Sequence, residues 1–228
     1  MRKLVWRTVL ALLLLFVLYQ LWLFAHICWW VKFDPSSSAF MADQLQVMQD
    51  KDPKAALKHK WVPYKKISGH LKRALIVAED AKFVDHEGFV WDGIQKAYEK
   101  NLKRGKIVAG GSTISQQLAK NLFLSTKRTP WRKGEEIIIT LMLEAVMDKQ
   151  RIFEIYLNVI EWGNGVFGAE AAARHYFGVS AASLSAEQAA RLAAMVPNPK
   201  YYDRHRQAPG MLYKTLIILD RMPDAEIP

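Results

Sequence analysis

An uncharged apolar stretch near the N-terminus constrains this chain more than any other feature. Between Arg7 and Lys32 no residue carries a charge, and Leu, Val, Phe and Trp dominate the composition. At 1.5 Å per residue, a helix over residues 8–31 is long enough to cross a hydrocarbon core of ~30 Å. We therefore expect one transmembrane helix over residues 8–31.

The flanking charges predict how this helix is oriented. Arg2, Lys3 and Arg7 precede the apolar stretch, so the positive-inside rule places residues 1–7 in the cytoplasm and the remaining chain outside it. A cleaved signal peptide is the main alternative, with a Ser-Ser-Ser-Ala run at 36–39 as its candidate cleavage site. The apolar stretch exceeds the usual signal segment of about 7–15 residues, which favours the anchor. A buried helix of a soluble protein fits less well.

The charge balance narrows the class of partner. The formal net charge is +10. Four of these positive charges belong to Arg2, Lys3, Arg7 and Lys32, which flank the span, and no acidic residue precedes residue 33. The chain beyond the span therefore carries 10 − 4 = +6. A basic domain held at a bilayer favours anionic headgroups or phosphorylated lipids. Nucleic acid is disfavoured, because an extracytoplasmic domain rarely meets it. The single cysteine, Cys28, lies in the predicted span, so no intrachain disulfide can form.

Helical periodicity dominates the sequence beyond the span. We expect a linker and membrane-proximal segment with a short helix over residues 32–63, and a compact domain over 64–228. Thr129 and Pro130 mark the start of one helix, with Thr129 as its N-cap. This helix is apolar nearly all round, which predicts a central core position. No segment shows the alternation of a β-strand, so the domain is expected to be mainly α. Helical spacing recurs at residues 71–78, 114–124, 130–147, 152–158, 170–177 and 185–195.

The first candidate site is a crowded acidic segment over residues 79–88. Glu79 follows Leu75 by one helical turn, which places it at the edge of an apolar face. Partial desolvation there raises the pKa of a carboxyl group, and a raised pKa suits a general base working near neutral pH. From these residues alone, an exposed acid in a charged turn is the alternative.

The second segment, residues 110–121, reads Gly-Gly-Ser-Thr-Ile-Ser-Gln-Gln-Leu-Ala-Lys-Asn. Its glycines free the backbone, and Ser112 or Thr113 can cap a following helix. Gln116, Gln117 and Lys120 then present amides and an amine near a helix N-terminus, which suits a cluster of anionic oxygens. The order Gly-Lys-Ser/Thr of a Walker phosphate loop is absent. A capped surface helix is the alternative.

Two further segments follow. Residues 128–136 combine Arg128, Arg132 and Lys133 with Glu136, which is a candidate second active-site acid. The alternative is a local ion pair, since Arg132 and Glu136 are one helical turn apart. Residues 149–158 have core spacing, and we interpret them chiefly as scaffold.

Taken in order, the four segments resemble the signature of the lysozyme-like peptidoglycan glycosyltransferases, family 51. The family motifs read Glu-Asp-x-x-Phe-x-x-His-x-Gly, then the long second segment, then Arg-Lys-x-x-Glu and Ile-x-Glu-x-Tyr-Leu-Asn. The resemblance covers about residues 64–202, and includes a later segment from Gly163 to Gly178. The one departure is Phe153, where leucine is commoner. The Ser-x-x-Lys and Lys-Thr-Gly motifs of the often-fused transpeptidase are absent, so the chain resembles the monofunctional members.

The resemblance implies a lysozyme-like domain that polymerises lipid II into β-1,4 glycan strands, with inversion and release of undecaprenyl pyrophosphate. Glu79 is then the expected general base and Glu136 a second essential carboxylate near the leaving group. Lys120 and Arg128 are expected to stabilise the pyrophosphate. Mg²⁺ or Mn²⁺ is compatible with this chemistry, although the sequence identifies no ligands. Further substrate contacts are expected from Ser112, Thr113, Gln116, Gln117, Arg132 and Lys133.

The resemblance also implies a setting and partners. The expected location is the bacterial inner membrane, with a single span and the catalytic domain on the periplasmic face. Expected partners are lipid II, the lipid-linked glycan strand, the bilayer, and proteins of cell-wall synthesis or division. Two other functions stay open. One is a membrane-anchored lysozyme-like enzyme that cleaves glycan, which would have no use for the Lys120 and Arg128 pair. The other is a non-catalytic lipid- or partner-binding protein, against which the two glutamates argue.

Overall fold

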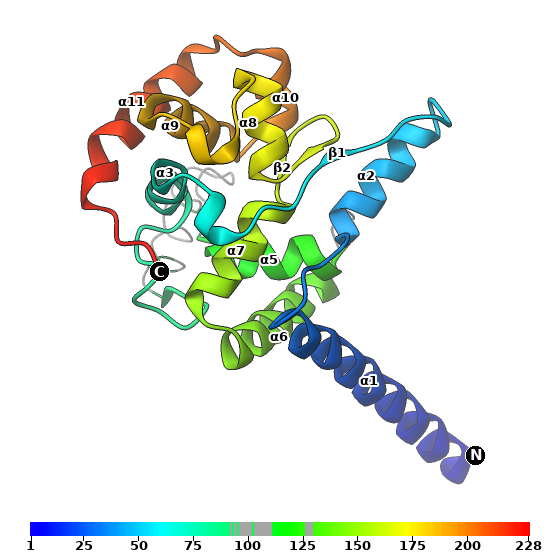
Figure 1. The fold of residues 1–228 in the computed structure, drawn as a ribbon. Helices are drawn as coiled ribbons and strands as arrows, with labels where there is room; N and C mark the ends of the chain where they lie inside the picture. The colour runs from blue at the N-terminus through cyan, green and yellow to red at the C-terminus, as the bar shows by residue number, and fades with distance from the viewer. Residues whose placement is uncertain (92, 94, 96–101, 103–110, 126–129) are drawn as a thin grey trace.

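The computed structural model describes residues 1–91, 93, 95, 102, 111–125 and 130–228. A long helix, α1 (Arg2–Trp30), projects from a domain built by the rest of the chain (Figure 1). Among the described residues, α1 is the one helix long and apolar enough to cross a membrane. The expected span of residues 8–31 lies within it, except that the helix ends at Trp30 and Val31 is its C-cap.

The domain is mainly α-helical, which confirms the expected fold class. Several helices begin where a side chain accepts an orphan backbone N–H group: Ser68, Thr113, Asp148 and Ser185 cap α3, α5, α7 and α9. The expected cap Thr129 lies outside the described residues. The helices are α2 (Ala39–Gln49), α3 (Gly69–Glu79), α5 (Ile114–Phe123), α6 (Pro130–Val146), α7 (Lys149–Val159), α8 (Ala169–Phe177), α9 (Ala186–Met195), α10 (Pro199–Arg204) and α11 (Pro209–Arg221), with 3-10 turns η1 (Tyr64–Lys66), η2 (Ala181–Ser183) and η3 (Met222–Asp224).

A small sheet, not expected from the sequence, joins distant parts of the chain. Its strands are β1 (Lys58–His59), β2 (Glu161–Gly163) and β3 (Val166–Phe167), in the order β1-β3-β2. β1 runs parallel to β3, and β2 runs antiparallel to it. Strands of two or three residues are too short to show alternation, so no sequence pattern indicates them. β1 also brings part of the segment 32–63 into the sheet.

The core is organised around α7 (Figure 1). The buried residues of α7 include Ile152, Phe153 and Leu157, and the helix packs against α5, α6 and α8. A second layer forms where α9 packs between α3 and α11. The sequence predicted a central position for α6, and this is only half right. Ile139 of α6 is fully buried, but Leu141, on another side of the helix, is 53% exposed.

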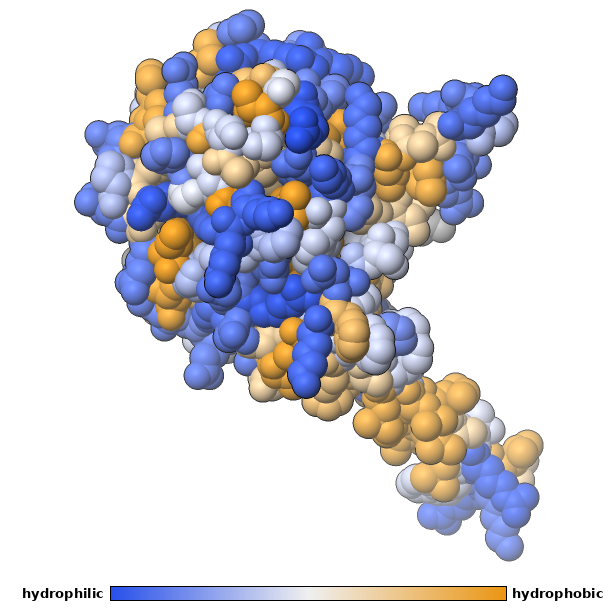
Figure 2. Space-filling model, in the orientation of Figure 1, coloured by the Kyte–Doolittle hydropathy of each residue, from blue (hydrophilic) through white to orange (hydrophobic). Residues whose placement is uncertain are grey.

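The C-terminal half of α1 rests on the domain and is not free along its length. Leu23 and Ile27 are buried, and α1 packs against α6. The ring of Phe16 lies edge-on to Trp131 of α6, with centroids 6.0 Å apart. Figure 2 shows apolar side chains covering most of α1 and continuing onto the adjoining part of the domain. The anchor and the domain therefore share one apolar surface.

Arg151 of α7 fixes the point where α1 leaves the domain. Its guanidinium donates hydrogen bonds to the carbonyl oxygens of Trp30 (2.9 Å) and Phe33 (2.8 Å). The same group forms ion pairs with Asp34 at 3.0 Å and Glu154 at 2.6 Å. Bonds to two carbonyls and two carboxylates tie the end of the anchor to the central helix of the core.

Candidate active site

The last residue of α3 is Glu79, and its side chain is 11% exposed. The amide Nε2 of Gln117 donates a hydrogen bond of 2.9 Å to Glu79 Oε2. The amine of Lys214 lies 3.8 Å from the other carboxylate oxygen, Oε1. Burial raises the pKa of Glu79, and the bond from Gln117 together with the charges of Lys214 and Lys120 opposes this rise. The carboxylate is thus desolvated but held by a donor and two cations.

The residue after Glu79 connects the acidic segment to α5. Asp80 is buried, and its Oδ2 accepts a hydrogen bond of 3.0 Å from the backbone N–H of Ile114, the first residue of α5. His86 Nε2 lies 3.0 and 3.1 Å from the two oxygens of Asp80. The backbone N–H of Gly88 donates to His86 Nδ1, so Nε2 is the nitrogen that carries the hydrogen toward Asp80. Asp80 and His86 therefore fold this loop against the N-terminus of α5.

Residues 112–117 have two roles: some of them cap α5, and Gln117 contacts Glu79. Thr113 and Gln116 form a capping box, in which the side chain of each accepts the other's backbone N–H, and both residues are buried. Ser112 is exposed. Gln117 turns toward Glu79. The structure thus brings Gln117 to the carboxylate and gives Thr113 and Gln116 a capping role; their substrate contacts, and that of Ser112, stay predictions.

Lys120 links the two candidate glutamates. Burial lowers the pKa of its amine, and the nearby charges of Arg132 and Lys133 lower it further. The negative charges of Glu136 and Glu79 oppose this lowering. A half-buried amine near two carboxylates is well placed to meet an incoming anion, because partial desolvation strengthens its electrostatic interactions.

The third segment lies on the first turns of α6. Glu136 is 5% exposed, and its Oε1 accepts a hydrogen bond of 2.5 Å from Lys133. The side chain of Lys133 is 57% exposed, so one end of this pair faces solvent. Arg132 donates to the carbonyl of Ser125 at 3.1 Å. Arg128 lies outside the described residues, so its expected role stays a prediction.

Sequence reasoning missed Lys214, which approaches Glu79 from α11. A signal for this helix exists in the sequence: Met211 and Ile218 recur at helical spacing, and Pro209 suits a helix start. No signal in the sequence indicates that Lys214 faces Glu79, because that meeting depends on how α11 packs against α3 and α9.

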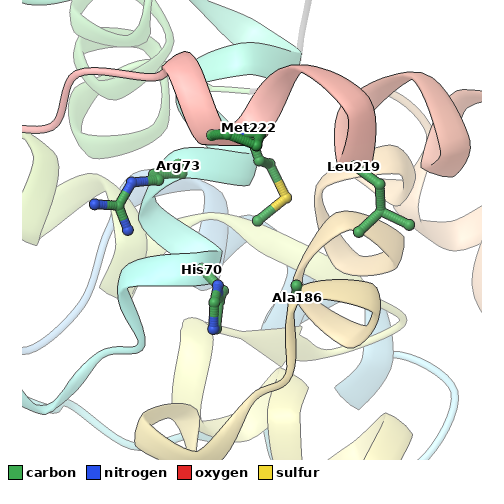
Figure 3. A pocket seen from close by; sticks show the side chains of 6 residues that line it. His70, Arg73, Ala186, Leu219 and Met222 are labelled. Atoms are coloured by element: carbon green, nitrogen blue, oxygen red, sulfur yellow. The ribbon is translucent and has the colours of Figure 1, made fainter.

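A pocket of about 260 Å³ lies away from these residues, between α3, the start of α9 and the C-terminal segment (Figure 3). Its lining is largely apolar, and the guanidinium of Arg73 points away from Met222 and Leu219. None of the candidate residues lines it. In the described part of the chain, no three His, Cys, Asp or Glu side chains come together as a metal site.

Comparisons with known proteins agree on one family. The sequence model of the family described as Transglycosylase matches residues 45–223. The chain is 70% identical over 227 residues to the biosynthetic peptidoglycan transglycosylase of Methylobacillus flagellatus, covering 100% of this chain and 99% of that protein. It is 64% identical over 228 residues to the protein of the same name from Chromobacterium violaceum, covering 100% of both. Identity to the Nitrosospira multiformis protein of this name is 63% over 223 residues, or 98% of this chain and 97% of the relative.

Proposed function

This chain belongs to the transglycosylase family, and from that membership we propose that it polymerises lipid II into β-1,4-linked glycan strands. The family assignment makes it a peptidoglycan transglycosylase, a glycosyltransferase of peptidoglycan biosynthesis. One observation carries the finer proposal. The desolvated carboxylate of Glu79 and the half-buried amine of Lys120 lie within electrostatic range of each other, and Lys120 also lies within range of Glu136.

The proposed reaction begins at Glu79. Its carboxylate takes the proton from the 4-hydroxyl of the acceptor sugar, and the resulting oxygen nucleophile attacks the anomeric carbon of the lipid-linked strand. The bond from that carbon to the pyrophosphate breaks, and undecaprenyl pyrophosphate leaves. Direct displacement on an α-linked donor gives a β-linked product, so the configuration inverts. The raised pKa of Glu79 suits this task, because a base with a pKa nearer the working pH accepts a proton more readily.

The leaving group needs stabilisation of negative charge more than it needs a proton. We assign this role to Lys120, supported by Arg132 and Lys133, with Arg128 as a further expected contact. Glu136 orients Lys133 through their hydrogen bond and favours the charged form of Lys120. The capping box of α5 contributes by holding Gln117 and Lys120 in place on the helix.

A divalent cation is compatible with this arrangement. Glu136 and the pyrophosphate oxygens of the substrate are the hard oxygen donors that Mg²⁺ or Mn²⁺ prefers. The ion would supply further charge neutralisation at the leaving group, and the proposed steps do not depend on it.

We also propose that the domain lies on the outer face of the inner membrane, with the N-terminus in the cytoplasm. Phe16 lies inside the expected span, and its ring contacts Trp131 in the first turn of α6. This contact supports a position of the start of α6 against the membrane. Lys133 and Glu136 follow Trp131 on the same helix, which supports a site close to the bilayer that holds the lipid-linked substrate.

Labelled lipid II distinguishes polymerisation from glycan cleavage. The full chain in lipid vesicles is incubated with labelled lipid II and, in a parallel reaction, with preformed glycan strands. The proposal predicts long polymer from the first and no shortening in the second. Shortened strands without polymer would support the lysozyme-like alternative, and no reaction in either would support a non-catalytic binding protein.

Lys120→Ala tests the leaving-group site. Loss of the amine is expected to lower turnover roughly 100-fold, a typical effect for removing one stabilising group at a developing charge. The melting temperature should change little, because Lys120 is not part of the capping box. Unchanged turnover with a clear loss of melting temperature would instead support the capped-helix interpretation.

A further inference from the structure

Tyr156 has no role in the reaction described so far, but its hydroxyl is bonded to the same amide that holds Glu79. It lies on α7, is fully buried, and belongs to the segment interpreted from sequence as scaffold. Its hydroxyl donates a hydrogen bond of 2.9 Å to Gln117 Oε1. Gln117 Nε2 in turn donates to Glu79 Oε2, also at 2.9 Å. The three side chains form a continuous chain from the core to the carboxylate.

We infer that Tyr156 is a positioning residue for the transglycosylase reaction, which acts on Glu79 by fixing the orientation of the Gln117 amide. This inference rests on the proposed role of Glu79 as base. It assigns a function to the hydroxyl group alone, since the ring of Tyr156 is accounted for by packing in the core.

The orientation of the amide follows from the two bonds together. An amide side chain presents an acceptor oxygen on one side and a donor nitrogen on the other. A tyrosine hydroxyl that donates to Gln117 Oε1 leaves Nε2 directed at the carboxylate. In the opposite orientation, Oε1 would face Glu79 Oε2, and two oxygens with partial or full negative charge would repel each other. The hydroxyl therefore stabilises the orientation in which Gln117 donates to Glu79.

The surroundings keep this hydroxyl a donor. Burial raises the pKa of Tyr156 well above its ordinary value, and the nearby charges of Glu79 and Asp80 raise it further. The phenol consequently stays protonated over the range of pH in which the enzyme works. Hydrogen bonds in such a chain also polarise one another, so the bond from Tyr156 strengthens the donor that faces Glu79.

One consequence concerns which oxygen of Glu79 accepts the proton. The Gln117 bond engages Oε2, whereas the neighbour of Oε1 is Lys214 at the longer distance of 3.8 Å. With Oε2 engaged by Gln117, Oε1 is assigned as the oxygen that receives the proton of the acceptor hydroxyl. A defined direction of approach matters, because proton transfer requires hydrogen-bond distance and alignment.

Tyr156→Phe tests the inference, because it removes the hydroxyl and keeps the buried ring. Polymerisation of labelled lipid II by the full chain in vesicles is measured across pH. We expect kcat to fall roughly tenfold, the effect of losing one neutral hydrogen bond at a reacting group, with KM nearly unchanged. The acid limb of the pH profile should move to higher pH, since a weaker donor at Oε2 favours the protonated carboxyl.

Tyr176→Phe is the matched control. Its hydroxyl donates to the carbonyl of Trp162 at 2.7 Å, away from Glu79, so its loss should lower the melting temperature without moving the acid limb. The inference is overturned if the two variants differ from wild type in melting temperature alone.

A double-mutant comparison adds a second test that does not depend on the fold of Tyr156→Phe alone. Gln117→Leu removes the intermediate amide, so adding Tyr156→Phe to it should change kcat no further. Independent, multiplying effects would overturn the inference. Glu79→Gln, measured in parallel, distinguishes a failure of the positioning role of Tyr156 from a failure of the base assignment of Glu79. If it is inactive while Tyr156→Phe behaves like Tyr176→Phe, only the positioning role fails. If Glu79→Gln is active, the base assignment fails and the positioning role falls with it.

Discussion

At the scale of single residues, the two oxygens of Glu79 have different neighbours, a donor at one and a cation at the other. The charge of Lys214 favours the ionised carboxylate and opposes the rise in pKa that burial causes. Its side chain is 34% exposed, so solvent screens part of this effect. The balance of these opposing influences sets the pH below which the base is lost.

Lys214→Met is therefore expected to move the acid limb of activity to higher pH. Without the cation, the pKa of Glu79 rises further above its ordinary value, and activity is lost as the pH falls through that pKa. The fall in rate near neutral pH should be several-fold, as for a partly screened charge. The measurement is the initial rate of polymerisation across pH, with the exposed Lys65→Met as control. An acid limb that stays in place would show that Lys214 does not act on Glu79.

The opposite limb belongs to Lys120, which must be protonated to stabilise the leaving group. Its pKa is lowered by burial, and Glu136 is the largest influence that opposes this. In Glu136→Gln the pKa should fall further, so activity should be lost at a lower pH as the pH rises. We expect a decrease in rate of about 100-fold at neutral pH, since charge stabilisation at the leaving group weakens. An alkaline limb that stays at the wild-type position would show that Glu136 does not act on the pKa of Lys120.

At the scale of elements, the loop that follows Glu79 is closed by Gly88. Its backbone has φ +85°, and a Cβ atom added there would lie 2.8 Å from Thr140 Cγ2 on α6 and 3.1 Å from Glu144 Cγ. Its carbonyl accepts a 2.7 Å hydrogen bond from Thr113, the cap of α5. The glycine thus allows the loop to contact α5 and α6 closely.

Gly88→Ala should lower the free energy of unfolding by about 2 kcal/mol, from the strained backbone together with the overlap at Thr140. Gly134→Ala is a natural comparison, because Gly134 lies inside α6 and an added Cβ would meet no atom within 4 Å. That change should raise stability by about 0.5–1 kcal/mol, the usual gain for alanine over glycine in a helix. Denaturant unfolding of the two proteins measures both. A loss in both, or in neither, would contradict this account of Gly88.

Local signals predicted much of the helical framework and less of its packing. Capping residues such as Thr113, and the apolar period of residues 152–158, act within a few residues of chain, so the helices they start or sustain were expected. The outward face of α6 was not expected, because the exposure of Leu141 depends on which distant elements pack against this helix. Long-range packing also determines the short strands and the approach of Lys214, and it leaves no period in the sequence.

The same contrast between local signals and long-range packing applies to the candidate site. The motifs identified Glu79, Gln117, Lys120 and Glu136, and the structure links these residues through a hydrogen bond and neighbouring charges. The motifs did not separate the capping role of Gln116 from the contact made by its neighbour Gln117. That distinction depends on which way each side chain leaves the helix, which is fixed by the N-terminus of α5.

At the scale of the whole molecule, the anchor and the domain are joined through Arg151. The fixed connection should hold the domain at one height and tilt above the bilayer. Arg151→Met removes the bonds to Trp30 and Phe33, and should lower the rate on lipid II in vesicles roughly fivefold through lost orientation. The rate on lipid II in detergent, where no bilayer sets the orientation, should change much less. Arg174→Met, which breaks an ion pair on α8, is the control. Equal losses in both media would argue for a general effect on folding.

The role of the Glu79 carboxylate as the base is tested by the polymerisation activity of Glu79→Gln. The measurement is polymer formed from labelled lipid II by the full chain in vesicles, together with the melting temperature. Glu161→Gln is the control, because Glu161 is also a carboxylate whose pKa burial raises, but it lies on β2 beside Lys200. We expect a folded Glu79→Gln protein that makes no polymer, and a Glu161→Gln protein that polymerises as wild type does. Polymerisation near the wild-type rate by Glu79→Gln would contradict it.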